Sequence, residues 1–322
     1  MPAPLARRTP TDVEPIEQLV ESARRYIAEG KAKSTRRAYR SSFAGFEGWC
    51  ASRGLSSCPA PPATVAVYLA ALADAGAAVA TIEKTLAAIA HEHRSHGHVW
   101  PRGEPAVRET MAGIRRKLGT SPASKKAPVN DGELAALVAT LGEDLAGLRD
   151  RALLTLGWSS ACRRSELVAL DVCDVELQTE GLLVHVRRSK GDQEGKGFDK
   201  GVPYASAPAL CAVRALRAWL DAAGITEGPI FRGVDRYGRV SKTRLSDRSV
   251  ARIVQRAASA AGLDPSRYGG HSLRSGFMTT AAEKGRPLEA IMRQTGHKSE
   301  RVARGYIQYA TVFKNNPAKG LV

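Results

Sequence analysis

Apolar side chains in the first third of the chain recur every three or four residues, the period of an amphipathic helix. One stripe consists of Ile16, Leu19, Val20, Ala23 and Ile27, and a second of Tyr39, Phe43, Phe46 and Cys50. Ser34 precedes the second stripe and is a candidate N-cap. Beyond the break at Pro59-Ala-Pro-Pro, the pattern predicts helices over residues 63–73, 81–93 and 106–118. Residues 13–118 are therefore expected to form an all-helical bundle, preceded by a disordered N-terminus of residues 1–12.

The rest of the chain combines helical periods with one β pattern. Residues 181–188 alternate apolar and polar side chains, and a glycine-rich turn leads to Val202-Pro-Tyr204, which predicts antiparallel strands. Helical spacing recurs over residues 131–141, 145–158, 208–222, 246–262, 272–283, 287–294 and 299–309. Residues 119–129 lack periodicity and have the Gly, Ser, Pro and Lys content of a linker. We expect a mainly α protein, whose second domain, residues 130–322 with a C-terminal tail, is mixed α/β with a small sheet.

The length and the charge narrow the classes of function. A chain of 322 residues fits about two domains. Lys and Arg number 48 against 32 Asp and Glu, a formal net charge of +16, which favours a polyanionic partner. Residues 1–127 carry 19 basic and 11 acidic side chains, and residues 128–322 carry 29 and 21, so each part has a surplus of 8. If nucleic acid is bound, both parts are expected to touch it.

Several other classes are disfavoured. The five cysteines form no C-x-x-C pair, which argues against a disulfide framework or a zinc ribbon and fits a reducing cytoplasm. The N-terminus lacks the apolar stretch of a secretory signal, and no apolar run is long enough to cross a membrane. The four histidines within residues 91–98 lack the i,i+4 spacing of a helical metal site, so no metal is expected.

Three short segments, residues 160–170, 270–274 and 295–306, carry the chemistry. They place an Arg three residues before a Glu, then an H-x-x-R motif, then a Gly-His followed nine residues later by a Tyr. The residues at these positions are Arg163 and Glu166, His271 and Arg274, and His297 and Tyr306. In this order and spacing they resemble the tyrosine recombinases, also called the phage integrase family. One departure is Ala161-Cys162 before Arg163, where the family usually has Gly-Leu or Gly-Met.

The resemblance covers nearly the whole chain and implies its architecture. The first domain is similar to the helical, SAM-like core-binding domain of Cre-type members. The second is similar to the family's catalytic domain, mostly helical with a small antiparallel sheet. The implied function is site-specific recombination, which cuts and rejoins DNA through a 3′-phosphotyrosyl intermediate and a Holliday junction. A type IB topoisomerase and a catalytically silent DNA-binding protein are the alternatives.

The residue types suit this chemistry on physical grounds. Attack on a phosphodiester concentrates negative charge on the non-bridging oxygens, which cations stabilise. An arginine donates two parallel hydrogen bonds and keeps its charge. The H-x-x-R spacing places His271 and Arg274 on one helical face, where both can reach the same phosphate. A tyrosine hydroxyl, with a reference pKa of about 10, needs such a cationic pocket to become a nucleophile.

The resemblance assigns a role to each matching residue. Tyr306 is the nucleophile, with Tyr309 as a rival one helical turn later. Arg163 and Arg274 clamp the phosphate, with Arg164 as a rival of Arg163. His271 assists proton transfer, His297 donates a hydrogen bond to the phosphate, and Glu166 supports the arrangement. Lys190 on the predicted hairpin is the general acid for the departing 5′ oxygen, and Lys196 and Lys200 are its rivals.

The resemblance also predicts the partners. Double-stranded DNA with short inverted-repeat sites is the substrate, a homo-tetramer assembles on it, and neither a cofactor nor a small-molecule substrate is required. The tail from residue 310 to residue 322 is a candidate for docking in a neighbouring subunit. Candidate DNA contacts in the first domain are Thr35, Arg36, Arg37, Arg40, Lys84, His91 and Arg94. Most side chains of this kind bind phosphate and carry no sequence information.

Overall fold

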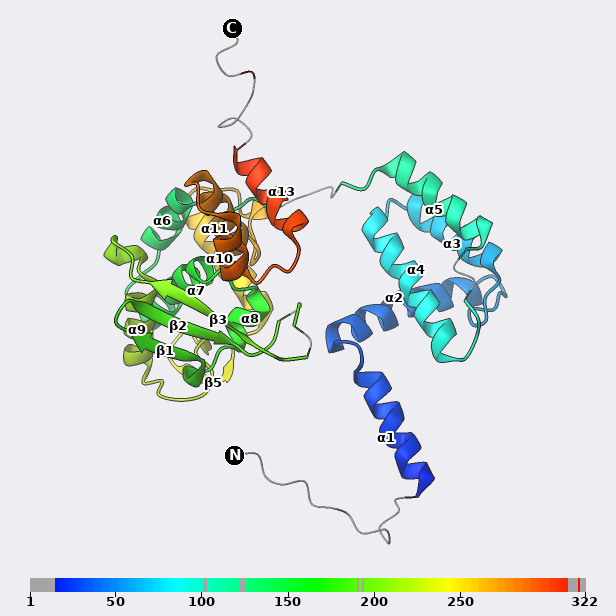
Figure 1. The fold of residues 1–322 in the computed structure, drawn as a ribbon, viewed down its shortest axis with the longest axis horizontal. Helices are drawn as coiled ribbons and strands as arrows, with labels where there is room; N and C mark the ends of the chain where they lie inside the picture. Colours follow the sequence, from blue (N-terminus) through cyan, green and yellow to red (C-terminus); the bar gives the residue numbers. More distant parts are fainter. Residues whose placement is uncertain are drawn as a thin grey trace. The chain divides into compact units, whose positions relative to one another are not determined.

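The chain divides into two compact units, Met1–Ala123 and Ser124–Val322 (Figure 1). The structure is a computed structural model that describes residues 15–100, 103–121, 126–189, 191–192, 194–311 and 318. The disorder predicted for residues 1–12, part of the predicted linker, Lys190 and nearly all of the tail lie outside the described residues. Each unit has its own hydrophobic core, so each is described by itself.

The first unit is helical in its described residues, as the apolar spacing predicts. Its helices are α1 (Ile16–Glu29), α2 (Lys33–Ala51), α3 (Pro62–Asp74), α4 (Val79–Ser95) and α5 (Pro105–Leu118). Helix α2 packs on α4 and α3 packs on α5, around fully buried Phe46, Leu69 and Ile82. The predicted cap was wrong, because α2 begins at Lys33 with Ala32 at the N-cap, which leaves Ser34 inside the first turn.

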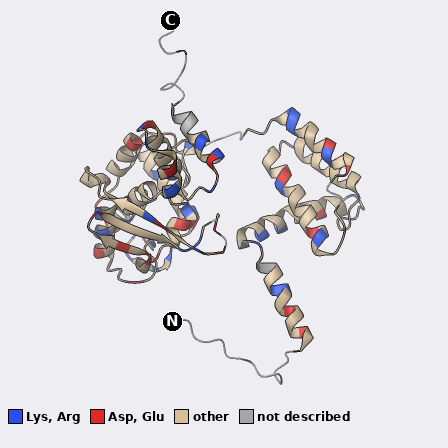
Figure 2. Cartoon of the chain, viewed as in Figure 1, with Lys and Arg blue, Asp and Glu red and all other residues tan. Residues whose placement is uncertain are grey.

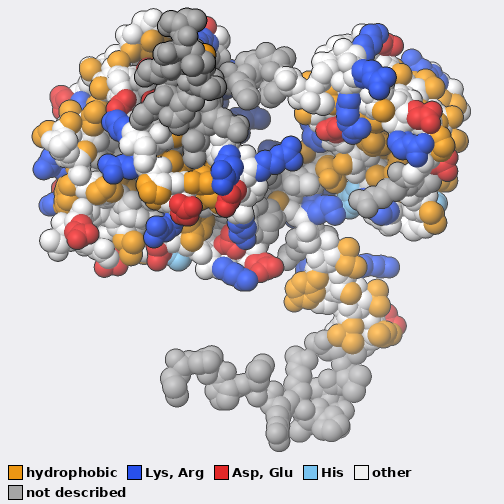
Figure 3. Space-filling view, turned by 45° about the horizontal axis from the view of Figure 1, so that its top comes forward, with side chains coloured by type: hydrophobic (Ala, Val, Ile, Leu, Met, Phe, Trp, Pro, Cys, Tyr) orange, Lys and Arg blue, Asp and Glu red, His pale blue; other side chains and the backbone are white. Residues whose placement is uncertain are grey.

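The apolar stripe of α1 does not join the core of this unit. Ile16, Leu19 and Ile27 are 66%, 46% and 78% exposed. Figure 3 shows hydrophobic side chains along this helix at the molecular surface. The period therefore predicts the helix correctly, but the stripe faces solvent in the single chain.

One member of the histidine cluster has a structural role. His93 is buried, its Nε2 accepts the backbone N–H of Ala60 at 2.8 Å, and its Nδ1 lies 2.8 Å from the carbonyl oxygen of Ile89. The ring therefore ties α4 to the segment before α3. Among the described residues, no group of three His, Cys, Asp or Glu side chains is placed to hold a metal ion.

The second unit is mostly helical and carries two small antiparallel sheets. Its α-helices are α6 (Asp131–Ala139), α7 (Leu145–Ser159), α8 (Arg164–Ala169), α9 (Ala212–Ala223), α10 (Asp247–Ala260), α11 (Ser272–Glu283), α12 (Leu288–Thr295) and α13 (Glu300–Thr311). Strands β1 (Val175–Gln178), β2 (Gly181–Val186) and β3 (Phe198–Pro203) pair in that order, and β4 (Arg232–Val234) pairs with β5 (Val240–Arg244). The alternation of residues 181–188 predicts β2, whereas β1, β4 and β5 are not predicted. The helix expected from residue 208 starts at Ala212, because Pro208–Leu210 form a separate 3-10 turn.

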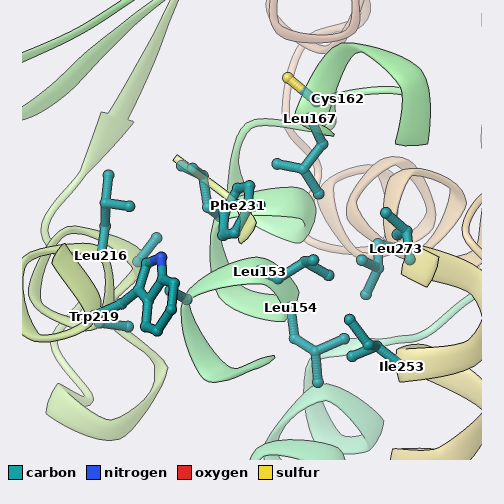
Figure 4. Close-up of a cluster of buried hydrophobic side chains, with 14 of the residues drawn as sticks. Leu153, Leu154, Cys162, Leu167, Leu216, Trp219, Phe231, Ile253 and Leu273 are labelled. Atoms are coloured by element: carbon teal, nitrogen blue, oxygen red, sulfur yellow. The ribbon is translucent and has the colours of Figure 1, made fainter. Parts of the chain in front are cut away.

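Helix α7 is the centre of this unit. Leu153, Leu154 and Leu156 are fully buried, and α7 packs against α9 and α11. Figure 4 shows Leu153 and Leu154 among Trp219, Phe231, Ile253 and Leu273. Cys162 of the following turn and Leu167 of α8 belong to the same cluster. The segment after α7 is therefore held by the core of the unit.

Backbone approaches α11 closely at a glycine. A Cβ on Gly276 would lie 1.7 Å from the carbonyl oxygen of Val129, which also accepts the indole N–H of Trp158 at 2.9 Å. The N–H of Val129 donates to the carbonyl of Ser272 at 2.9 Å. Only glycine fits here, and this contact fixes the start of the second unit against α11. No helix in the described part of the chain is both long and apolar enough to cross a membrane.

We expect Gly276→Ala to lower the free energy of unfolding by about 3 kcal/mol or more, because a methyl group cannot occupy the position of a backbone oxygen. Thermal denaturation measures the effect. Gly113→Ala is the control, because Gly113 lies inside α5 with no atom within 4 Å of an added Cβ. This control should raise stability by up to about 1 kcal/mol through helix propensity. Equal behaviour of the two variants would contradict the close approach at Gly276.

Candidate active site

The candidate site is built on the turn that joins α7 to α8. Ala161 adopts a left-handed conformation with φ 49°, the only positive φ outside glycine in the described residues. This conformation costs an alanine about 1–2 kcal/mol, whereas a glycine adopts it without that cost. The turn aims the Ala161 carbonyl at Arg274, whose Nη1 donates to it at 2.7 Å.

Arg163 is oriented by a buried carboxylate. It is the N-cap residue of α8, and Glu166 lies in the first turn of that helix with a side chain only 2% exposed. Oε2 of Glu166 accepts the backbone N–H of Arg163 at 2.9 Å, and Oε1 accepts Nη1 of the same residue at 2.5 Å. One carboxylate thus caps the helix and holds the guanidinium, which stays partly exposed.

The neighbouring Arg164 has a different orientation. Its Nε lies 3.1 Å from Oδ2 of Asp247 at the start of α10, and both side chains are largely exposed. The three-residue spacing to Glu166 favours Arg163, which is the arginine that Glu166 binds.

Arg274 is a deeply buried cation of the site. Arg274 lies on α11 and is only 1% exposed. Its Nη2 lies 3.2 Å from Nε2 of His297. Within the described part of the chain it forms no ion pair with a carboxylate within 4.0 Å. Burial and the charge of Arg163 lower the pKa of Arg274 to about 10, so it remains charged at neutral pH. A cation held in this way favours an anionic ligand.

His271 and Tyr306 meet across the site. His271 is the N-cap residue of α11 and Tyr306 lies on α13, and their Nε2 and Oη atoms are 3.1 Å apart. Burial, Arg274 and Arg163 lower the pKa of His271. A neutral imidazole at this distance can accept the proton of the tyrosine hydroxyl.

His297 follows a left-handed Gly296 at the end of α12. Its Nδ1 lies 2.8 Å from Oγ1 of Thr295, which is fully buried and donates to the carbonyl of Ile291 at 2.7 Å. Burial and the charge of Arg274 lower the pKa of His297 to about 4. Thr295 was not among the predicted residues; the only signal for it is a hydroxyl two positions before the histidine.

The hairpin of β2 and β3 borders the site, because Ser189 and Asp192 line one pocket together with His297. Lys190 itself lies outside the described residues. Arg187, directly after β2, binds Asp174 through Nε and Nη2 at 2.5 and 2.6 Å. Of the two rivals, Lys196 is exposed and lies 3.4 Å from Glu194. Lys200 is fully buried and donates to the carbonyl of Ser160 at 2.8 Å. Its ammonium is therefore directed under the turn and away from the surface.

The charges of the described site do not balance. Arg163, Arg274 and Lys200 are positive, and Glu166 is the carboxylate among them. The two histidines lie beside these cations with lowered pKa values and are neutral at pH 7. The site thus offers a cationic pocket, a base and a hydroxyl nucleophile, which is the set needed to attack a phosphodiester.

The candidate DNA contacts of the first unit lie on two helices that pack together. Thr35, Arg36, Arg37 and Arg40 belong to α2, and Lys84, His91 and Arg94 belong to α4. The rings of Tyr39 and His91 are 5.5 Å apart between these helices. Burial and the charge of Lys31 lower the pKa of His91. Figure 2 shows Lys and Arg on helices of both units. Contact of these residues with DNA stays a prediction.

Fold and site together define an enzyme that attacks phosphodiesters with a tyrosine, and comparison with known proteins specifies its family. The phage integrase family model matches residues 129–311. An integrase/recombinase xerD homologue from Selenomonas ruminantium is 40% identical over 308 residues, covering 94% of this chain and 90% of the relative. The tyrosine recombinase XerC of Chlamydia pneumoniae is 27% identical over 256 residues, covering 78% and 74%.

Solved structures show the same fold. A lambda integrase dimer bound to a COC′ core site has a TM-score of 0.59 at 20% identity and covers 91% of this chain and 94% of that chain. The XerH site-specific recombinase bound to a palindromic difH substrate has a TM-score of 0.56 at 18% identity, covering 78% and 68%. The chain belongs to the phage integrase family. It is a site-specific tyrosine recombinase that cuts and rejoins DNA, and the comparisons do not favour the topoisomerase or the silent DNA-binding protein.

The low pKa of His297 has a measurable consequence. An unfolded histidine titrates near pH 6.5, whereas His297 titrates at about 4 in the folded chain, so acid protonates the unfolded state first. Stability contributed by neutral His297 is therefore complete above about pH 6.5 and is lost as the pH falls to about 4. We expect the Tm of the wild type to fall more steeply across this range than that of His297→Asn. Equal slopes in thermal denaturation would contradict a neutral His297.

Proposed function

We propose that Tyr306 cuts the DNA strand and that the surrounding side chains divide the remaining chemistry between them. Oη of Tyr306 attacks the scissile phosphorus while its proton passes to His271, which supports this role by its 3.1 Å distance and lowered pKa. A bond forms between Oη and phosphorus, and the bond from phosphorus to the 5′ oxygen breaks. The 3′ end stays attached to the protein until a 5′ hydroxyl reverses the step.

The negative charge that develops on the phosphate meets two guanidiniums. Glu166 holds Arg163, whose guanidinium stays partly exposed. The buried Arg274 has no carboxylate partner among the described residues, so its charge is not neutralised. His297 completes the clamp with a hydrogen bond to a non-bridging oxygen. This requires Nε2 of His297 to carry a proton, so phosphate must displace the contact of that atom with Arg274. The unbalanced positive charge of the pocket supports such an exchange.

The departing 5′ oxygen needs a proton, which we assign to Lys190. The support is its place on the loop between β2 and β3, next to the segment that Arg187 and Asp174 anchor. Of the rivals, Lys196 faces solvent, and Lys200 is enclosed with its ammonium on the Ser160 carbonyl.

No cofactor is required, because the phosphotyrosyl bond conserves the energy of the phosphodiester for rejoining.

On DNA we propose a homo-tetramer that joins two sites with short inverted repeats and exchanges strands in pairs through a Holliday junction. The XerH structure contains a palindromic substrate, and the lambda integrase structure contains a dimer on a core site. The positive surplus in both parts of the chain supports contact of both units with DNA. The exposed stripe of α1 supports contact between subunits, because a solvated apolar stripe of this kind marks an interface.

The enzyme would act in a bacterial cytoplasm, and the cysteines, all free, agree with a reducing compartment.

The first experiment traps covalent protein–DNA adducts by denaturing the source cells and sequencing the attached DNA. Wild-type reads are expected to accumulate at a few inverted-repeat sites. Tyr306→Phe, which lacks the nucleophilic oxygen, should yield no adduct, and Tyr309→Phe should retain the adducts. Adducts that survive in Tyr306→Phe would overturn the assignment, and wild-type adducts scattered over the genome would indicate relaxation instead of recombination.

A modified leaving group tests Lys190. A substrate with sulfur at the 5′ bridging position releases a thiolate, which needs no proton donor. Lys190→Ala should lose cleavage of normal DNA by about 100-fold or more and recover most of it on the sulfur substrate. Equal losses on the two substrates would refute the role of general acid.

A further inference from the structure

Lys200 occupies a core position of the sheet. Along β3 the exposed and buried residues alternate, and Lys200 and Val202 are the buried ones. Lys200 pairs across the sheet with Val184, which is also fully buried. An apolar side chain would satisfy this position, whereas an ammonium ion loses its hydration there. The buried ammonium group therefore needs polar partners that replace the lost water.

Besides the ring of Phe198 on its own strand, the partners of Lys200 lie in the turn after α7 and in α8. Nζ of Lys200 donates to the carbonyl of Ser160 at 2.8 Å and lies 4.0 Å from Oε2 of Glu166. The next carbonyl along the chain, that of Ala161, accepts from Arg274. Two cations from separate elements thus hold consecutive carbonyls of one turn, and the lysine also faces the carboxylate that orients Arg163.

Glu166 depends on this arrangement. Its side chain is 2% exposed and both its oxygens bind Arg163. Arg163 is partly exposed and has to turn toward a bound phosphate, whereas Lys200 stays beneath the site with a side chain that solvent does not reach. A second, fixed cation holds the buried carboxylate in place while the guanidinium engages the substrate.

We propose that Lys200 is a positioning residue, which holds Glu166 and the turn over residues 160–162 so that Arg163 meets the scissile phosphate. It does not touch the substrate. This inference rests on the proposed contact of Arg163 with the phosphate, and it separates Lys200 from the general acid, for which it was a rival.

The test measures single-turnover cleavage by Lys200→Met and Lys200→Gln on three DNA substrates. The first has a normal scissile phosphate. The second has a methylphosphonate there, which removes the negative charge that Arg163 neutralises. The third has sulfur at the 5′ bridging position, which removes the need for a general acid. Arg163→Ala is the reference, and Lys242→Met, an exposed lysine on β5, is the matched control with wild-type rates expected.

We expect Lys200→Met to cleave normal DNA about 100-fold more slowly, the effect of misplacing a catalytic group by about 1 Å. The sulfur substrate should leave that deficit unchanged, and the methylphosphonate should reduce it to less than about 10-fold, as in Arg163→Ala. The double variant should be no slower than Arg163→Ala by more than about twofold, because both changes remove one function. Lys200→Gln can still donate to the Ser160 carbonyl without a charge. It should fold like the wild type and show the same substrate pattern.

Other outcomes overturn the proposal. Recovery on the sulfur substrate would make Lys200 a general acid. Three other results would exclude a positioning role for Lys200. They are equal losses of rate on all three substrates, additive losses in the double variant, and wild-type rates in Lys200→Gln. If Arg163→Ala itself cleaves normal DNA at the wild-type rate, the proposed phosphate contact fails. If only the Lys200 variants do so, this inference fails and the proposed function stands.

Discussion

Burial of the Arg274 guanidinium beneath the turn after α7 is the constraint on which the rest of the site depends. Its residue is 1% exposed, and its described partners are a carbonyl oxygen and a neutral imidazole. Removing a charge from water is costly, and these partners offset only part of that cost. The remaining imbalance favours binding of a phosphate. The core around Leu153 and Leu154 holds the turn in place, so fold stability maintains the binding site.

The same cations determine the state of the two histidines. Burial, together with the charges of Arg274 and Arg163, lowers the pKa values of His271 and His297. Both rings are therefore neutral in the free protein. For His271 this state is needed if it accepts the proton of Tyr306. In the proposed complex, the negative charge of the phosphate lets the ring of His297 act as a donor. One set of charges thus favours an anionic ligand and keeps both histidines neutral in the free protein.

The proposed nucleophile, Tyr306, is held less centrally than the residues around it. Tyr306 packs with Met278, Ala282, Ile291 and Ala303 in a small cluster separate from the main core of the unit. Helix α13 contacts α11 and α12, and its tyrosine meets His271 at the start of α11. The arginines are therefore fixed by the main core, whereas the position of the tyrosine depends on the packing of one terminal helix.

The sequence by itself determined the helices, because burying one face of a helix requires apolar residues at the helical period. It also determined Arg163, Glu166, His271, Arg274, His297 and Tyr306 as the candidate set, because short motifs keep such residues at constant spacing. The strands β1, β4 and β5 could not be predicted, because they are short and have no buried face that alternates; their side chains range from exposed to half-buried.

Only the tertiary structure decided what surrounds each side chain. It showed the apolar stripe of α1 in solvent, His93 in a core, and Lys200 under the active-site turn instead of at the surface. The decisive contacts join residues far apart in the chain: Lys200 meets a carbonyl 40 positions away and Arg274 one 113 positions away. Local spacing records the period of an element, but the solvation of a charge depends on which distant atoms replace water around it.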